Sequence, residues 1–477
     1  MKGYLITLMC EIATLAALCP HLLAQSVPVR RQERWRFLAP STEVSDDPRR
    51  VPVPPGVQGA KGILVLRGGR IFDGTGAPAH PGTLVIVGNK IKTILPATAT
   101  ATDWPKESQV IDVSGTTILP GLIDLHTHIT SPELDDDDQL ASSQSEATLR
   151  GVDHLRYFIE SGITSIRDVA SRGEVPFLLK AWISKNRLPG PRIFAAGQLI
   201  TVRGGHSDEA GKSEGGNTSG DPITGDTYVA SGPDQWREAV RVQFRRGADL
   251  IKIASHFSRP EVAAAVEEAH ALGLKVTCDC ETFYTGWAVE AGVDMIEHPL
   301  PRTDETIRLM AEKKVASDPT LMTYIILFNR FGNYYNSPSR RFTFSEDINF
   351  KLVTKLKNAG ITLGVGTDLI DNWYQALPTP YIDELKQFVK LGYSVPQTLV
   401  AATKTNAELL DMGDKLGTLE PGKLADITVV SGQPDVTLDD LANVEIVIRD
   451  GYIEVNHGQT FIPRHVPIPL PKPWVQQ

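Results

Sequence analysis

Four apolar segments of the 477-residue chain contain or end in side chains that commonly bind metal ions. The five side chains are His126 and His128 in P-G-L-I-D-L-H-T-H, Lys252 in D-L-I-K-I, His298 in D-M-I-E-H, and Asp368 in L-G-V-G-T-D. Residues two apart on a β-strand point to the same face, so the two imidazoles of H-T-H converge. Converging imidazoles are natural ligands for a divalent transition metal. The pattern therefore predicts a metal site.

Lys252 has apolar neighbours on both sides, which indicates that its amine is buried. Burial disfavours the charged form of a lysine and lowers its pKa. A neutral amine reacts with carbon dioxide to form a carbamate, which is a carboxylate able to bridge two metal ions. The alternative is a lysine paired with a neighbouring acidic side chain.

The stretch V-T-C-D-C-E-T at 276–282 is predicted to begin as a short buried strand, with Asp279 between Cys278 and Cys280. These are the two cysteines that remain once a predicted signal peptide is removed from the four in the chain. Because neighbours along one extended strand are poorly placed for a strain-free disulfide, we expect two packed, reduced thiols. The buried carboxylate between them needs a partner.

Strand-like and helix-like segments alternate through 119–415, with eight strand candidates each followed by a helix or a long loop. This alternation predicts a (β/α)8 barrel, whose active site would lie at the carboxyl ends of the strands. The aromatic-rich stretch 321–350 fits no regular period, and we expect it to form a long loop over the barrel mouth.

Short β-branched runs cut by Gly, Asn and Pro occupy 61–118 and return over 416–465. They predict one small discontinuous β-sandwich-like domain built from segments on both sides of the barrel, with a hairpin at G-N-K. The flanking stretches 25–60 and 466–477 are predicted to be an extended arm and a Pro-rich tail.

The N-terminus carries Lys2, an apolar stretch over 5–18 and L-L-A at 22–24, which together predict a signal peptide over 1–24. Glu11 and Pro20 interrupt this segment, so it is too short for a stable membrane span of roughly 20 apolar residues. We therefore expect an exported protein, periplasmic or extracellular. The formal net charge of -9 and the lack of a basic stripe argue against a nucleic-acid partner. A homo-oligomer stays open.

The chain resembles the amidohydrolase superfamily, and most of all its imidazolonepropionase-related and prolidase-like members. The motifs are P-G-L-I-D-L-H-T-H, G-A-D-L-I-K-I, G-V-D-M-I-E-H-P, G-V-G-T-D and L-G-T-L-E-P-G-K-L-A-D-I, and the resemblance covers 62–455. It implies two divalent metal ions, with zinc favoured. His126, His128 and Asp368 would hold the first, a carboxylated Lys252 would bridge both, and His298 would help hold the second.

The resemblance also implies a histidine at the end of the fifth barrel strand, where this chain has Asp279. Three interpretations stay open. Asp279 binds the second metal, since a carboxylate is an acceptable zinc ligand; the enzyme has one metal only; or the second site is empty and activity is altered or lost. Glu281 is a candidate substitute ligand.

The predicted function is cleavage of amide C–N bonds in dipeptides, N-acyl amino acids or cyclic amides by metal-activated hydroxide. Asp368 would be the general base, and His206 in R-G-G-H would be a catalytic or substrate-binding donor. Arg203 and Tyr228 are further candidates for substrate binding, as are Tyr324 and Trp373 for the pocket wall. The alternatives are a deaminase with one metal and a catalytically altered binding protein.

Overall fold

The structure is a computed structural model, and it describes residues 60–132, 143–208, 225–331 and 345–462. The predicted signal peptide, nearly all of the predicted arm and the predicted Pro-rich tail lie outside these residues. Among the helices in the described ranges, none combines the length and the apolar character needed to cross a lipid bilayer.

The strands, in chain order, are β1 (Ile63–Ile71), β2 (His80–Val87), β3 (Lys90–Pro96), β4 (Gln109–Asp112), β5 (Thr116–Pro120), β6 (Leu122–Thr127), β7 (Ile163–Asp168), β8 (Arg192–Ala195), β9 (Leu199–Thr201), β10 (Thr227–Val229), β11 (Leu250–Ala254), β12 (Lys275–Asp279), β13 (Met295–Glu297), β14 (Ala316–Asp318), β15 (Ile427–Ser431), β16 (Val444–Arg449), β17 (Tyr452–Asn456) and β18 (Gln459–Thr460). The helices are α3 (Gln144–Glu160), α4 (Val175–Ser184), α5 (Pro233–Arg246), α6 (Arg259–Ala271), α7 (Thr282–Ala291), α8 (Asp304–Lys313), α9 (Leu321–Phe331), α10 (Glu346–Asn358), η2 (Asp371–Ala376), α11 (Thr379–Lys390), α12 (Val395–Val400), η3 (Ala401–Thr405), α13 (Asn406–Leu409) and η4 (Leu438–Ala442).

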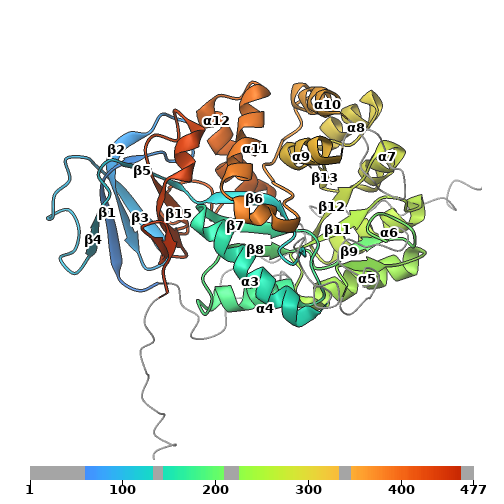
Figure 1. The fold of residues 1–477 in the computed structure, drawn as a ribbon, viewed down its shortest axis with the longest axis horizontal. Coiled ribbons are helices and arrows are strands. Elements are labelled where there is room, and N and C mark those ends of the chain that lie inside the picture. Colours follow the sequence, from blue (N-terminus) through green and yellow to red (C-terminus); the bar gives the residue numbers. More distant parts are fainter. Residues whose placement is uncertain (1–59, 133–142, 209–224, 332–344, 463–477) are drawn as a thin grey trace, which may run out of the picture.

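A nine-stranded sheet combines strands from both ends of the described chain, in the order β18-β17-β16-β15-β5-β1-β2-β3, with β4 beside β1. It forms the lobe at the left of Figure 1. Strands β15 and β5 pair antiparallel, so the segment after the helices is hydrogen-bonded to the segment before them. The predicted G-N-K hairpin is confirmed, because β2 and β3 pair antiparallel around it. Whether this sheet is an independent domain stays a prediction.

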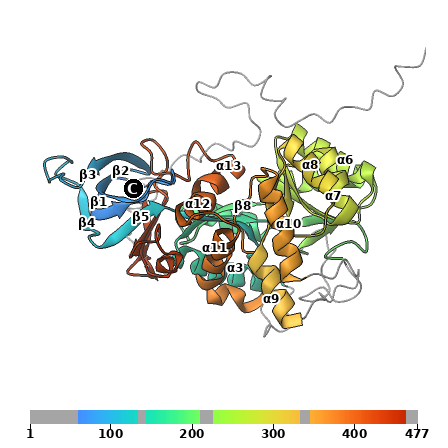
Figure 2. The ribbon, with the colours of Figure 1, turned by 90° about the horizontal axis from the view of Figure 1, so that it is seen from above.

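The remaining strands form two parallel sheets, β6-β7-β8 and β10-β9-β11-β12-β13-β14. Helices α3 to α8 and α10 to α12 lie around them in Figures 1 and 2. The backbone N–H of Asp249 donates to the Ala195 carbonyl across 2.8 Å and links the two sheets next to β8. The result is a TIM-barrel-like α/β fold with parallel sheets.

The predicted eighth strand, 361–368, runs between β14 and β6 but forms only one isolated bridge, Ser317 with Leu363. Backbone hydrogen bonds hold it on both sides, from Gly364 N to Ser317 O at 2.9 Å and from Leu125 N to Val365 O at 3.0 Å. A side chain at Gly366 would meet the Asp318 carboxylate at 2.2 Å. Glycine therefore lets this segment approach its neighbours closely, at the expense of regular pairing.

Helix α5 shows how the sequence directs packing. Its buried residues Trp236, Ala239, Val240 and Gln243 recur at the spacing of one helical face. The helix ends at Gly247, which has a positive φ of 104° that glycine adopts without a steric penalty.

Two predictions about the helices are corrected. The stretch 321–350 is not one long loop, because α9 begins at Leu321 and α10 begins at Glu346, while 332–344 lie outside the described residues. Apolar and aromatic residues occupy most positions of α9, so its sequence shows no clear helical period. Helix α4 was not expected.

Candidate active site

All six predicted metal ligands lie at the carboxyl ends of the parallel strands or directly after them. They are His126 on β6, His128 one residue beyond it, Lys252 on β11, Asp279 at the end of β12, His298 after β13, and Asp368 at the end of 361–368. His128 is part-buried and the other five are buried. The fold thus gathers side chains from five segments at one edge.

The cluster has two halves, the second centred on Asp279 and the first on Asp368. Its Oδ1 atom is 3.4 Å from Nε2 of His126 and 3.2 Å from Nε2 of His128. Its Oδ2 atom is 3.6 Å from Nδ1 of His298. Ligand atoms of His126, His298 and Asp368 lie within 4.8 Å of one another, close enough to share one ion.

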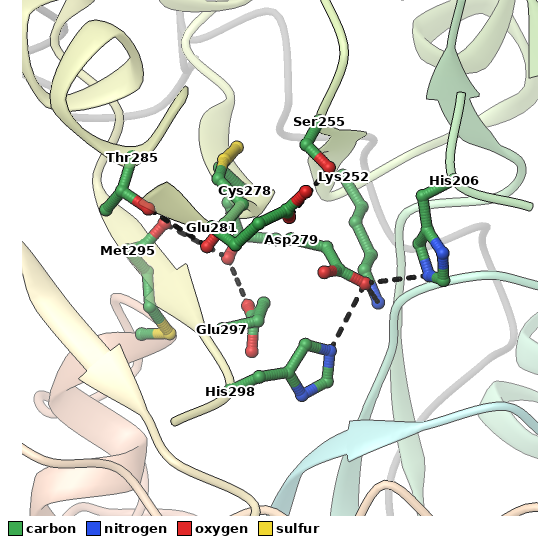
Figure 3. Close-up of a disulfide and its surroundings, with 12 residues drawn as sticks. His206, Lys252, Ser255, Cys278, Asp279, Glu281, Thr285, Met295, Glu297 and His298 are labelled. Carbon is green, nitrogen blue, oxygen red and sulfur yellow. Dashed lines mark hydrogen bonds and ion pairs between the residues drawn. A yellow bond between two sulfur atoms is a disulfide. The ribbon is translucent and has the colours of Figure 1, made fainter. Parts of the chain in front are cut away.

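Asp279 lies at the centre of the other half, shown in Figure 3. Its Oδ2 atom is 3.3 Å from Nε2 of His298, 3.1 Å from Nε2 of His206 and 3.9 Å from Nζ of Lys252. Glu281 points away from this point, because its carboxylate accepts a hydrogen bond from the Ser255 hydroxyl at 2.8 Å. This arrangement gives no support to Glu281 as a substitute ligand, which stays a prediction.

These separations fit metal coordination. Two tetrahedral zinc ligands, each at ~2.0–2.1 Å from the ion, lie ~3.3–3.4 Å apart. The four pairs formed by Asp368 with His126 and His128, and by Asp279 with His298 and His206, span 3.1–3.4 Å. The donor set of imidazole nitrogens and carboxylate oxygens also suits a divalent transition metal.

Lys252 lies between the two halves. Its Nζ atom is 3.1 Å from Nε2 of His126 and 3.9 Å from the Asp279 carboxylate. This position is compatible with both interpretations made from the sequence, a lysine paired with an acidic side chain and a bridging carbamate. The carbamate stays a prediction.

A buried acidic residue, Glu297, holds His126 from behind. Its Oε2 atom is 2.9 Å from Nδ1 of His126, which leaves Nε2 facing the site. Arg167 donates to Glu297 at 2.8 Å, and the Thr277 hydroxyl also donates to it. Burial, followed by the charge of Lys252, lowers the pKa of His126 well below its ordinary value. A neutral imidazole is the form that binds metal.

Sequence reasoning did not find Glu297, because strand alternation should place it on the face opposite to His298. The structure breaks this alternation at His298, whose φ is +63°, so both side chains point inward. Asp368 has a similar φ of +53°. Left-handed backbone at residues other than glycine is strained and concentrates at functional sites. The missed signal was the charged pair E-H at the end of an apolar strand.

Asp368 is held as a carboxylate. Burial acts to raise its pKa, but the electrostatic interaction with His298 and the hydrogen bond with His128 outweigh burial and lower it below the ordinary value. Its backbone N–H donates to the His126 carbonyl at 2.8 Å. A buried carboxylate kept ionised can accept a proton.

An apolar wall borders the cluster. Tyr324 of α9 packs with Leu300 and Leu327, and Ile370 and Trp373 cover them. The Tyr324 ring lies 5.4 Å from the His298 ring, centre to centre. Two of the aromatic residues suggested for a substrate pocket therefore do lie beside the site.

The structure does not bring the other two substrate-binding candidates to the cluster. Arg203 is exposed on the loop after β9, and Tyr228 of β10 packs against the main hydrophobic core. Their roles stay predictions.

The expectation of two reduced thiols is wrong, because the structure joins Cys278 and Cys280 in a disulfide. The strand ends at Asp279, so Cys280 is no longer part of the extended chain, and the two Cα atoms are 5.4 Å apart. That distance lies in the usual range for disulfides. Both cysteines are buried in the core, on the side away from the metal ligands.

Comparison with known proteins agrees with a metal-binding site. The model of the amidohydrolase family matches residues 117–453. The chain belongs to the amidohydrolase family. Members of this family hydrolyse amide or peptide-like substrates and are typically metal-dependent, and the described residues contain candidate metal-binding groups.

Three relatives illustrate the range of the family. Ochratoxinase of Aspergillus niger is 27% identical in an alignment of 411 positions that covers 78% of this chain and 82% of that protein. Imidazolonepropionase of Symbiobacterium thermophilum is 24% identical, covering 77% and 86%. The crystal structure of a Xaa-Pro dipeptidase with methionine bound in its active site is 27% identical, with a TM-score of 0.71, covering 82% and 99%. The resemblance to prolidase-like and imidazolonepropionase-related members is thus confirmed.

Proposed function

We propose that this protein is a metal-dependent hydrolase of amide C–N bonds in dipeptides or N-acyl amino acids, with Asp368 as the general base. The observation that carries the proposal is the approach of His126 and His128 to one oxygen of Asp368, with distances from Nε2 to Oδ1 of 3.4 and 3.2 Å. His126, His128 and Asp368 would hold a first divalent ion, and His298, Asp279 and Lys252 would contribute to a second. Zinc is favoured because three of the six ligands are imidazoles, which suit this metal.

Divalent ions bound here would supply acidified water and a polarised substrate carbonyl. The chain's own part is proton transfer. Asp368 is ionised and lies at the site's centre, so it can take the proton of the attacking water and pass it to the leaving amine. His128 and His298 orient its two oxygens from opposite sides.

The substrate class is proposed from the apolar wall. Tyr324 lies beside His298 and packs with Leu300 and Leu327, so a substrate with a bulky apolar group next to its scissile amide would bury that group there. The relatives named for Xaa-Pro dipeptides and ochratoxin also point to compact amides. Export from the cytoplasm is part of this proposal and rests on the sequence of 1–24.

The test is a hydrolysis screen of Xaa-Pro dipeptides, N-acyl amino acids with aromatic or aliphatic side chains, and cyclic amides. Asp368→Asn should abolish turnover of any substrate found and leave the circular dichroism spectrum of the protein unchanged. Turnover retained in Asp368→Asn would rule out this residue as the base. If chelator-treated wild-type protein kept its activity, the metal-dependent function would be wrong.

A further inference from the structure

The loop that carries His206 is built tightly. Gly204 has a φ of +72°, which is favourable for glycine and strained for other residues. A side chain at Gly205 would meet the Thr201 hydroxyl at 2.5 Å and the Val202 carbonyl at 3.0 Å. The two glycines of R-G-G-H therefore let the loop fold back on β9 and bring His206 toward Asp279.

Three nitrogen atoms from three different segments approach one oxygen atom, Oδ2 of Asp279. They are Nε2 of His206 at 3.1 Å, Nε2 of His298 at 3.3 Å and Nζ of Lys252 at 3.9 Å. Imidazole nitrogens and carboxylate oxygens are both zinc ligands, so His206, His298 and Asp279 bring three such ligand atoms together.

We propose that His206 is a metal ligand, and that with Asp279 it rebuilds the second metal site that the fifth strand cannot complete with a histidine. This inference rests on the proposed metal-dependent function. It also assigns His206 a different role from that of a substrate donor. Its Nε2 atom faces the Asp279 carboxylate.

The ligand chemistry supports this assignment. A histidine on the fifth strand together with His298 would have supplied two imidazoles to the second ion. Here His206 and His298 supply two imidazoles, and Asp279 adds a carboxylate. Two imidazoles and one carboxylate form a protein ligand set used by catalytic zinc sites. The Lys252 Nζ atom lies 3.9 Å from the Asp279 carboxylate.

His298 is already oriented for this role. Its Nδ1 atom is 2.8 Å from the Thr320 hydroxyl, so that contact occupies Nδ1 and turns Nε2 toward Asp279. A partner on the second nitrogen commonly fixes the tautomer of a metal-binding histidine. The second site thus has one oriented imidazole, His298, and the loop supplies the second imidazole, His206.

The experiment is a zinc titration of the chelator-treated full chain in the presence of bicarbonate, for the wild type and His206→Asn. Stoichiometry is measured by elemental analysis, and affinity by competition with a chromogenic chelator. We expect two ions per wild-type chain. His206→Asn should keep one ion at wild-type affinity and bind the other at least ~100-fold more weakly, since loss of a direct ligand should exceed the 10–100-fold effect of outer partners.

His256→Asn is the matched control. His256 also lies on a loop after a barrel strand, and its Nε2 atom is 3.9 Å from the buried carboxylate of Glu281. Its side chain is 26% exposed, against 22% for His206. This variant should bind two ions as the wild type does, so a general effect of removing a loop histidine would be visible.

Each outcome decides the matter. Two ions bound at wild-type affinity by His206→Asn would overturn the inference and leave the proposed hydrolase intact. One ion in both proteins would also overturn it and favour a mononuclear enzyme. No ion in the wild type would refute the proposed function itself.

A double variant separates a missing ligand from a disturbed fold. Asp279→His with His206→Asn places an imidazole on the fifth strand, so it should bind two ions again. If the second ion is still lost, the loss in His206→Asn cannot be assigned to a missing ligand and the inference falls.

Discussion

Replacing Glu297 with glutamine would remove one negative charge from behind the metal cluster while keeping the side chain's shape. Glu297 is fully buried and accepts hydrogen bonds from Arg167 at 2.8 Å and from the Thr277 hydroxyl. It also lies 2.9 Å from Nδ1 of His126. The variant therefore disturbs two neighbours. Arg167 loses a buried ion-pair partner, and His126 loses the carboxylate that holds its ring.

The effect on stability follows from Arg167. Removing one partner of a buried ion pair costs ~3–5 kcal/mol because the other charge stays buried. Asp318 lies 3.4 Å from Arg167, and burial followed by the charge of Glu297 raises its pKa well above the ordinary value. In Glu297→Gln that repulsion disappears, so Asp318 can ionise and partly compensate. We therefore expect Glu297→Gln to lower the free energy of unfolding by about 3 kcal/mol, the lower end of that range.

The effect on metal binding follows from His126. Loss of the carboxylate that holds a metal-binding imidazole typically weakens metal affinity by ~10–100-fold. Asp318 does not restore this contact, because among the described residues the hydrogen-bond partner at Nδ1 of His126 is Glu297. We expect the affinity for the first ion to fall in that range.

The assay combines urea unfolding of the chelator-treated protein with a zinc competition titration. Glu281→Gln is the matched control, since Glu281 is also buried near the site but accepts a hydrogen bond from Ser255 instead. The control should keep wild-type zinc affinity. If folded Glu297→Gln binds zinc as tightly as the wild type, the contact does not orient His126 and the reasoning is refuted.

Two further predictions concern the scaffold. Tyr374→Phe should lower the free energy of unfolding by about 1–3 kcal/mol, because the phenol oxygen accepts from His128 N at 3.2 Å and donates to the His128 carbonyl at 2.6 Å; an unchanged urea midpoint would contradict this. Glu384 has its pKa raised by burial from 4.5 to about 8, so its contribution to stability is present at low pH and is lost as pH rises through about 8. The wild type should therefore lose stability relative to Glu384→Gln between pH 5.5 and 8.5, measured by urea unfolding at both values, and parallel behaviour of the two proteins would disprove the shift.

Most of the fold was open to prediction because it follows from local pattern. The face of α5 with Trp236 and Val240, and the apolar strands before His126 and His298, repeat with the periods of helix and strand. Helix α9 was missed because apolar residues occupy most of its own positions and hide the helical period. The disulfide was missed because its geometry depends on where β12 ends.

The sequence by itself determined which side chains are available for chemistry and on which strand ends they stand. It did so because alternation along a strand and the position of a strand end are short-range properties. His126, His128, Lys252, His298 and Asp368 could be named on that basis, and the family assignment followed from the same motifs.

Only the tertiary structure decided which of these atoms meet. His206 and Asp279 belong to different strand ends, and no spacing along the chain relates them, yet their side chains are 3.1 Å apart. Glu297 and His298 are adjacent in sequence, and both point inward because the backbone at His298 adopts a positive φ. Contacts between segments far apart in sequence depend on how the barrel brings its strand ends together, and local residue patterns carry no information about that distance.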